Sequence, residues 1–287
     1  MSDRLAVLPQ YLLPKQAMTR LAGRIASAEA GALTTRLIRW FVGRYGVNMA
    51  EAAEPDIARY PSFNAFFTRA LKPDARPLAD APWVCPVDGA ISQIGPLDGE
   101  RLVQAKGHHY TATALVGGDA ALAREFHGGH FATLYLSPRD YHRIHMPAAG
   151  TLRRMIHVPG ELFSVNPTTA RGVPGLFARN ERVVCVFDGE AAPFVMVLVG
   201  ATIVGSMATT WHGVVNPPRS GQLRDWTYAP GDVSLSRGQE MGRFLLGSTV
   251  VMLFPPGPLQ FNPDWAPGGA IRMGEVMALP DLFAVGA

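Results

Sequence analysis

Apolar residues near the N-terminus recur at the spacing of an amphipathic helix. Leu21 and Ile25 are four positions apart, and the same interval recurs after Gly31. This spacing places apolar side chains on one face of a helix. We therefore predict helices within residues 11–46, with Gly31 separating two of them. A shorter helix is predicted over Phe63–Leu71, with the serine that precedes it as its N-cap.

From about residue 83 the pattern changes to short apolar segments separated by glycine and proline turns. The segments are Ala90–Ile94, Leu102–Ala105, Phe131–Leu136, Leu152–Val158, Arg182–Phe187, Phe194–Val199, Thr202–Met207 and Thr249–Phe254. Many short strands with such turns indicate an antiparallel or mixed β barrel or sandwich. The predicted fold class is α+β: a helical segment and crossover over residues 1–80, followed by a mainly β domain over residues 81–287.

Positive charge is concentrated in the first 46 residues. They contain seven basic and two acidic residues, whereas the remaining 241 residues contain 19 basic and 21 acidic ones. This asymmetry indicates a local anionic partner for the N-terminal segment and argues against nucleic acid as a partner. A basic amphipathic helix suits the surface of an anionic membrane. Ordinary packing of the helices on the domain explains the pattern equally well.

Targeting segments and cysteine pairs are not evident. We find no secretory signal, and no uninterrupted apolar segment reaches the roughly 18 residues expected of a membrane span. Cys85 and Cys185 lie a hundred positions apart, and neither belongs to a Cys-x-x-Cys pair. We therefore predict two buried free thiols and no metal site.

One serine directly follows a glycine at the start of a predicted strand. Gly247 precedes Ser248, and a β-branched apolar run begins at Thr249. Glycine has no Cβ, so it leaves its carbonyl accessible to the neighbouring hydroxyl. The simplest interpretation is a turn before a strand. The alternative is a serine that attacks its own peptide bond.

A serine nucleophile needs a base, and the base usually needs an orienting carboxylate. The richest supply of candidates is the polar segment 137–147, which contains His142 and His145. We expect a loop there that leads into a short strand. Asp88 is the best candidate for the carboxylate, although an Asp-Gly pair by itself indicates only a turn.

Further motif-like segments are spread over nearly the whole chain. They are Leu21-Ala-Gly, Ser62-Phe-Asn-Ala-Phe-Phe-Thr-Arg69, Pro86-Val-Asp-Gly-Ala-Ile-Ser92, Gln104-Ala-Lys-Gly-His108, Leu136-Ser-Pro-Arg-Asp-Tyr-His-Arg-Ile-His-Met-Pro147, Val158-Pro-Gly-Glu-Leu-Phe-Ser-Val165, Leu176-Phe-Ala-Arg-Asn-Glu-Arg182, Val199-Gly-Ala-Thr-Ile-Val-Gly-Ser206 and Gly242-Arg-Phe-Leu-Leu-Gly-Ser-Thr249. In this order and spacing, the chain resembles the phosphatidylserine decarboxylases of the bacterial, membrane-associated (prokaryotic type I) family.

The resemblance implies a self-processing, pyruvoyl-dependent enzyme of phospholipid biosynthesis that converts phosphatidylserine to phosphatidylethanolamine and CO₂. Asp88, His145 and Ser248 match the family's processing triad. Ser248 Oγ would attack the Gly247 carbonyl, with His145 as the base and Asp88 fixing its tautomer. Cleavage between Gly247 and Ser248 would give a β chain of residues 1–247 and an α chain that starts with a covalent pyruvoyl group.

The resemblance also implies how the processed enzyme works. The pyruvoyl carbonyl made from Ser248 would form a Schiff base with the substrate's amine and withdraw electrons as CO₂ leaves. His142 is our candidate for the proton donor, because a histidine whose pKa is near neutrality suits general-acid work. The α chain, residues 248–287, would stay with the β chain as a heterodimer that dimerises further. The N-terminal helices would bind peripherally at the cytoplasmic face of the cell membrane.

Two other functions fit the same residues. A serine hydrolase or amidase would use Ser248, His145 and Asp88 on external substrates and would keep its chain intact. A membrane-bound β-barrel module without catalytic activity would show neither processing nor turnover.

Overall fold

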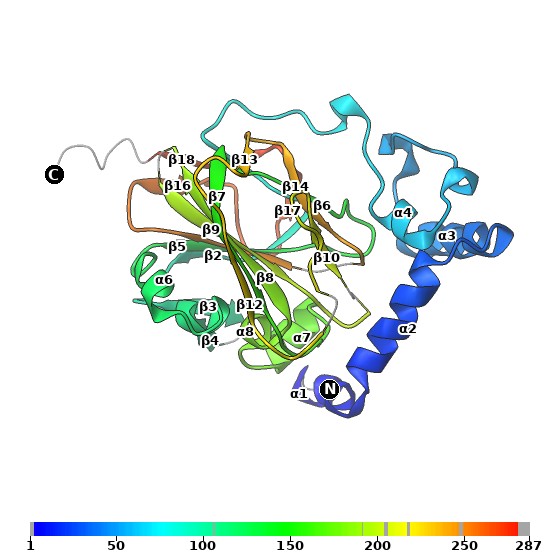
Figure 1. Ribbon diagram of the computed structural model, residues 1–287, viewed down its shortest axis with the longest axis horizontal. Coiled ribbons are helices and arrows are strands. Elements are labelled where there is room, and N and C mark those ends of the chain that lie inside the picture. Colours follow the sequence, from blue (N-terminus) through cyan, green and yellow to red (C-terminus); the bar gives the residue numbers. More distant parts are fainter. Residues whose placement is uncertain are drawn as a thin grey trace.

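The computed structural model describes residues 3–105, 107–190, 192–203, 206–216, 219–246 and 249–280. Helices line one flank of a β-rich body, shown on the right-hand side of Figure 1. They are α1 (Asp3–Leu12), α2 (Lys15–Ser27), α3 (Ala32–Tyr45) and α4 (Phe63–Phe67). Two 3-10 turns, Met49–Glu51 and Ile57–Arg59, connect α3 to α4, and a third, Pro73–Ala75, follows α4. We call α1–α4 the N-terminal helical unit.

The helical prediction for residues 11–46 is confirmed, and α1 adds a helix that begins before it. The predicted N-cap of α4 is also confirmed, because the Ser62 side chain accepts a hydrogen bond from the Ala65 N–H at 3.2 Å. The sequence predicted that this helix would end at Leu71, but it ends at Phe67. Phe63, Phe66 and Phe67 are buried in the core of the N-terminal helical unit.

A large antiparallel sheet forms the centre of the β-rich body. Its strands are β2 (Gly89–Pro96), β5 (His130–Tyr135), β7 (Gly150–Val158), β8 (Arg182–Gly189), β9 (Pro193–Val199), β12 (Arg224–Thr227), β13 (Ser234–Leu235), β15 (Thr249–Phe254) and β17 (Ala270–Ile271). The order is β12-β7-β8-β9-β15-β5-β2-β17, and β13 pairs with β7. The strand that follows position 248 therefore lies between β5 and β9, away from the sheet edges.

Both faces of the central strands of this sheet are buried. Side chains alternate along β9, so that Phe194, Met196 and Leu198 belong to one hydrophobic cluster and Val195, Val197 and Val199 belong to another. Successive residues of a strand point to opposite faces. A strand covered on both faces therefore reads as a continuous apolar run, which is why the sequence pattern locates β8, β9 and β15.

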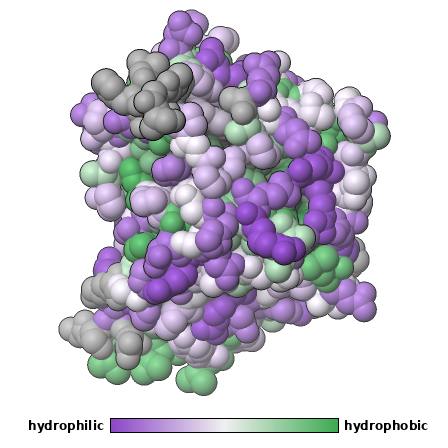
Figure 2. All heavy atoms as spheres, turned by 90° about the vertical axis from the view of Figure 1, so that its left-hand side faces the viewer, coloured by the Kyte–Doolittle hydropathy of each residue, from purple (hydrophilic) through white to green (hydrophobic). Residues whose placement is uncertain are grey.

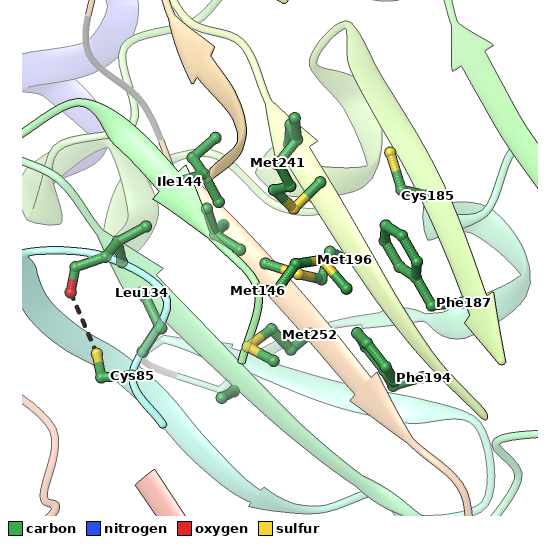
Figure 3. Packing of buried hydrophobic residues seen from close by; sticks show 14 of the residues in the cluster. Cys85, Leu134, Ile144, Met146, Cys185, Phe187, Phe194, Met196, Met241 and Met252 are labelled. Atoms are coloured by element: carbon green, nitrogen blue, oxygen red, sulfur yellow. Dashed lines mark hydrogen bonds between the residues drawn. The ribbon is translucent and has the colours of Figure 1, made fainter. Parts of the chain in front are cut away.

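A smaller sheet packs against the first of these faces. It contains β6 (Arg143–His145), β10 (Met207–Thr209), β11 (Gly213–Val214) and β14 (Glu240–Phe244), in the order β11-β10-β14-β6. Figure 3 shows Ile144, Met146 and Met241 from this side meeting Cys185, Phe187, Phe194, Met196 and Met252 of the large sheet. The arrangement is an open sandwich and not a closed barrel. Cys85 and Cys185 are buried free thiols, as predicted.

A third sheet extends the same layer, and short helices cover the other face of the large sheet. The third sheet consists of β1 (Trp83–Val84), β18 (Val276–Pro280) and β16 (Leu259–Phe261). The covering elements are the hairpin β3 (Arg101–Ala105) and β4 (His108–Thr111), with α5 (Ala112–Leu115), α6 (Ala120–Arg124), α7 (Pro167–Gly172) and α8 (Leu176–Arg179). The resulting body has three layers.

The predicted strand Thr202–Met207 is wrong. Thr202 and Ile203 form a turn, and β10 begins only at Met207. The Ile203 N–H donates to the Thr19 hydroxyl of α2 at 3.1 Å. This turn therefore pairs with the N-terminal helical unit and not with a neighbouring strand.

Large exposed apolar side chains concentrate on the N-terminal helical unit. They include Leu5, Leu8, Tyr11, Leu12, Leu13, Leu21, Ile25, Leu33, Trp40 and Tyr45. Figure 2 views the molecule from the left-hand side of Figure 1, away from α2 and α3, and this face is largely hydrophilic. Within the described ranges, every helix is too short or too polar to cross a membrane.

Candidate active site

The chain leaves the small sheet at the end of β14. The Phe244 N–H donates to the His142 carbonyl at 3.0 Å, and the Leu245 N–H donates to the Ser206 carbonyl at 3.0 Å. The first bond holds the chain beside the loop that precedes β6, and the second holds it beside the residue that precedes β10.

The chain enters the large sheet at Thr249, which is buried and pairs with Tyr135 and Val199. The predicted cleavage site, Gly247 and Ser248, lies outside the described residues. The chain before it leaves β14 of the small sheet, and the chain after it enters β15 of the large sheet.

Leu246 has an unusual backbone conformation two positions before Ser248. Its φ angle is +148°, in a region that residues other than glycine rarely adopt. Such a conformation costs about 1–3 kcal/mol and persists only where the surroundings impose it. The Leu246 side chain packs against the core of the N-terminal helical unit and against the core under the large sheet. Packing on both sides therefore holds a strained residue next to the predicted cleavage site.

His142 is buried at the joint between the two regions. Its ring lies 4.0 Å from that of Phe67 in α4, measured between centroids. Its Nδ1–H donates to the Asp140 carbonyl at 2.8 Å, and Nε2 is buried without a partner among the described residues. Burial lowers the pKa of His142 to about 3. The ring is therefore neutral, with a free lone pair on Nε2. This corrects our expectation of a pKa near neutrality.

His145 lies in β6, in the predicted short strand, and both of its ring nitrogens have partners. Nδ1–H donates to the Gly238 carbonyl at 2.8 Å, and Nε2 lies 3.0 Å from the Tyr141 hydroxyl. Burial lowers the pKa of His145 and raises that of Tyr141 to about 12. Tyr141 therefore keeps its proton and donates it to Nε2. His145 is a neutral imidazole whose lone pair is covered by one hydroxyl.

Asp88 is bound by other groups than His145. Arg76 donates to both carboxylate oxygens, with Nε at 2.9 and 3.1 Å, and the Met273 N–H donates to Oδ1 at 2.9 Å. Arg76 also donates to Glu51 at 2.7 Å. The expected contact, in which Asp88 fixes the tautomer of His145, is not formed in this structure. The Gly238 carbonyl takes that place.

Asp88 and His145 are nevertheless held in neighbouring segments. The His145 N–H donates to the Pro86 carbonyl at 2.9 Å. Gly89 has a φ of +155°, and a Cβ there would lie 2.2 Å from the Tyr135 carbonyl oxygen. Only glycine allows this close approach of β2 to the end of β5.

An apolar pocket of about 250 Å³ opens beside Leu246. Its walls come from the N-terminal helical unit (Phe41, Tyr45 and Phe67), from the end of β5 (Tyr135 and Leu136) and from the loops 164–166 and 201–203. Tyr45 and Ile203 are also among the exposed apolar residues. The pocket therefore extends from Leu246 to the apolar surface of the helices.

Sequence reasoning missed three partners in this site. Tyr141, which covers His145, directly precedes His142, and the sequence pattern showed it only as one member of a polar segment. Arg76, which binds Asp88, lies in the crossover between the helices and the β-rich body. The Gly238 carbonyl is a backbone acceptor, and no side-chain pattern signals it.

Comparisons with known proteins identify the family. The family model described as phosphatidylserine decarboxylase matches residues 63–279, and a second one, described as PSD, matches residues 5–46. The phosphatidylserine decarboxylase proenzyme of Albidiferax ferrireducens is 74% identical over 278 residues, covering 97% of this chain and 98% of the relative. The proenzyme of Azoarcus sp. is 72% identical over 284 residues, covering 99% and 98%. This chain belongs to the phosphatidylserine decarboxylase family.

Proposed function

We propose that this chain is a proenzyme that cleaves itself between Gly247 and Ser248 and then converts phosphatidylserine to phosphatidylethanolamine and CO₂. Family membership supports the reaction. The observation that best supports self-cleavage is the separate anchoring of the chain before and after the site, Leu245 at Ser206 and Thr249 in the large sheet. One peptide bond can break there while both new ends stay in place as a heterodimer.

In the proposed cleavage, Ser248 Oγ attacks the Gly247 carbonyl carbon, and the C–N bond of that peptide gives way to an ester. Elimination across Cα and Cβ of residue 248 releases the Gly247 carboxylate. Hydrolysis then leaves a pyruvoyl group and ammonia. His145 suits the role of base, because it is neutral and its Nε2 carries a lone pair. The Tyr141 hydroxyl must release this lone pair, or pass the proton on, before His145 can act.

In this proposal Asp88 positions His145 through other residues and does not contact its ring. Its carboxylate ties the crossover, through Arg76, to the Met273 backbone of the future α chain. That contact holds the segment containing Pro86, which in turn binds the His145 backbone. We therefore assign Asp88 the role of a positioning residue for His145.

The proposed decarboxylation needs a group that accepts electrons as CO₂ leaves, and a pyruvoyl carbonyl at the start of the α chain supplies it. Nε2 of His142, which is buried and has no partner within the described ranges, fits such a site. Because His142 is neutral, it is not an acid at the outset. In the complex, the negative charge of the substrate's carboxylate favours a protonated ring, and the imidazolium then gives its proton to the carbon that CO₂ leaves. This sequence keeps His142 as the proton donor in a second step.

The N-terminal helical unit is the proposed membrane contact. Its exposed apolar side chains and the net positive charge of residues 1–46 suit an anionic lipid surface. The apolar pocket meets this surface at Tyr45 and Ile203. A lipid can therefore reach the site while most of its acyl chains stay in the bilayer. Moving those chains into water would cost about 0.8 kcal/mol per CH₂.

The intact mass of the purified protein tests the proposal. We expect two chains, with a pyruvoyl group at the start of the smaller one, and decarboxylation of phosphatidylserine. Ser248→Ala should remain one chain without activity, whereas Ser236→Ala, at an exposed serine of the same region, should cleave normally. An unbroken wild-type chain that decarboxylates the lipid would contradict self-cleavage. An unbroken chain that hydrolyses esters would favour the hydrolase instead.

Two further variants separate the roles of the histidines. His145→Ala should stay uncut. His142→Ala should still be cut but should lose decarboxylation, because it retains the base and lacks the proton carrier. An uncut His142→Ala protein beside a cut His145→Ala protein would reverse the assignment.

A further inference from the structure

A second pocket lies on the other side of the segment that precedes the proposed cleavage site. It has a volume of about 300 Å³ and is lined in part by α2, Asn64, Arg219 and Leu245. Leu245 faces this pocket, whereas the next residue, Leu246, lines the apolar pocket. Three positions separate Leu245 from Ser248, so their Cα atoms are at most about 11 Å apart. The same short segment of chain therefore divides a polar pocket from an apolar one.

Three arginines line the second pocket and make it positively charged. Arg20 and Arg24 lie about one turn apart on α2, and both are exposed. Arg219 Nε donates to Glu181 Oε2 at 2.9 Å, and the other oxygen of Glu181 lies 2.9 Å from His157 Nε2. Glu181 and His157 are buried. A buried carboxylate therefore fixes one arginine in the wall, while two more extend from the helix opposite.

Asn64, which lines the pocket, has a side-chain oxygen with no partner in the part of the chain that the structure describes. This Oδ1 atom is buried. A buried polar group left unpaired costs free energy, which a ligand with a matching group recovers. Oxygen and nitrogen of a carboxamide are assigned from such partners, so Asn64 can present either a donor or an acceptor.

Arg20 and Arg24 lie directly beside exposed apolar residues of α2. Leu21 and Ile25 follow Arg20 and Arg24 directly on α2, and both are large exposed apolar residues. Apolar side chains of an interfacial helix enter the acyl boundary of the bilayer, and the neighbouring basic side chains reach the headgroups. The pocket therefore opens beside the proposed membrane surface.

Phosphatidylserine offers two anionic groups, and the reaction distinguishes them. The carboxylate loses its charge as CO₂ leaves, so a cation held on it would stabilise the substrate more than the transition state and would slow the reaction. The phosphodiester keeps its charge throughout, and arginine binds such oxygens through charge-assisted hydrogen bonds. Provided that the chain acts on phosphatidylserine as proposed above, we infer that the pocket of Arg20, Arg24 and Arg219 binds the phosphodiester of the substrate.

Kinetics in mixed micelles of phosphatidylserine and a neutral detergent test this inference. A contact made equally in the substrate and the transition state contributes to KM and not to kcat. The double variant Arg20→Gln/Arg24→Gln should raise KM by about tenfold or more, with kcat within about twofold of the wild type. Its self-cleavage should be complete. Glycerophosphoserine, a soluble probe that carries the same phosphodiester, should inhibit the wild type more strongly than this variant.

The matched control is Arg101→Gln/Arg124→Gln, which removes the same charge from exposed positions of β3 and α6, outside the N-terminal helical unit. In micelles its KM should equal that of the wild type. An unchanged KM for the α2 variant, an equal rise in both variants, or a fall in kcat alone would overturn the phosphodiester assignment. These results differ from a failure of the proposed function, in which the wild-type protein itself would not decarboxylate phosphatidylserine.

Discussion

The β-rich body buries its apolar residues, whereas the N-terminal helical unit leaves many of its apolar residues exposed. All six residues of β15 are buried, whereas Leu12 of α1 is 89% exposed and Leu33 of α3 is 70% exposed. The β-rich body is complete by itself, because each apolar face is covered by another layer of the same chain. The helical unit leaves apolar area exposed. Exposed apolar area of this kind is typical of a surface that binds a membrane or another protein.

The candidate site lies where these two regions meet. His142 is enclosed by Phe67 of the helical unit and by the loop before β6. Arg143 joins the regions, since its Nε donates to the Thr68 carbonyl at 2.8 Å and its Nη1 to Glu240 at 2.9 Å. The candidate site therefore needs residues from both regions. In the uncut Ser248→Ala protein, which serves as the single-chain parent, we expect the loss of unfolding free energy on substitution to decrease from the β-rich body through the joint to the helical unit.

The largest loss of stability is expected in the core of the β-rich body. Phe194 is fully buried, stacks on Phe187 with ring centroids 5.2 Å apart, and meets the edge of Trp83 at 5.2 Å. Phe194→Ala removes these contacts and leaves a cavity, so we expect a loss of about 3–5 kcal/mol. Unfolding in urea measures it. A loss below about 1 kcal/mol would mean that this core is not closely packed.

A smaller, pH-dependent effect is expected at the joint. The pKa of His142 is about 3 in the folded protein and 6.5 in the unfolded chain. Between these values the unfolded chain binds more protons, so stability is complete above pH 6.5 and is lost as the pH falls toward 3. The loss is about 1.4 kcal/mol per pH unit, or about 2 kcal/mol between pH 6.5 and 5.

His142→Asn tests this contribution, because the amide can still donate to the Asp140 carbonyl but does not titrate. Unfolding in urea at pH 6.5 and 5 should show the smaller pH dependence in the variant. Phe67→Ala, which opens one wall around the ring, should reduce the pH dependence in the same direction. Identical slopes in the parent and His142→Asn proteins would contradict the burial of a neutral imidazole.

The fold was predictable from the sequence wherever a repeat was long enough to read. The strands β8, β9 and β15 appear as apolar runs because both of their faces are buried. Helices α5 to α8 have only four to six residues, which is less than two helical turns, so the apolar period does not repeat within them. The run Thr202–Met207 looks apolar enough for a strand, but the turn at its start is set by Thr19, a residue distant in the sequence.

The candidate site was predictable in its residue types and not in its pairings. The sequence identified two histidines in one polar loop, and the structure places both near the chain that leads to Ser248. It did not show that burial makes His142 neutral, because Phe67 comes from another region. Nor did it show that Asp88 binds Arg76, since a carboxylate beside a candidate base has the same sequence pattern whether or not the two touch.

The smallest effect on stability is expected on the exposed face of the helical unit. Leu12→Ser/Leu33→Ser changes two exposed side chains and should alter the free energy of unfolding by less than about 0.5 kcal/mol per site. The same variant should bind anionic vesicles several-fold more weakly, because each leucine can bury apolar area in the bilayer. Val103→Ser, at an exposed position of β3, is the control and should bind vesicles as the parent does. Flotation with phosphatidylglycerol vesicles measures the binding. If the double variant floats like the parent, or unfolds as readily as Phe194→Ala, then the helices complete their surface within the protein and the contrast between the two regions does not hold.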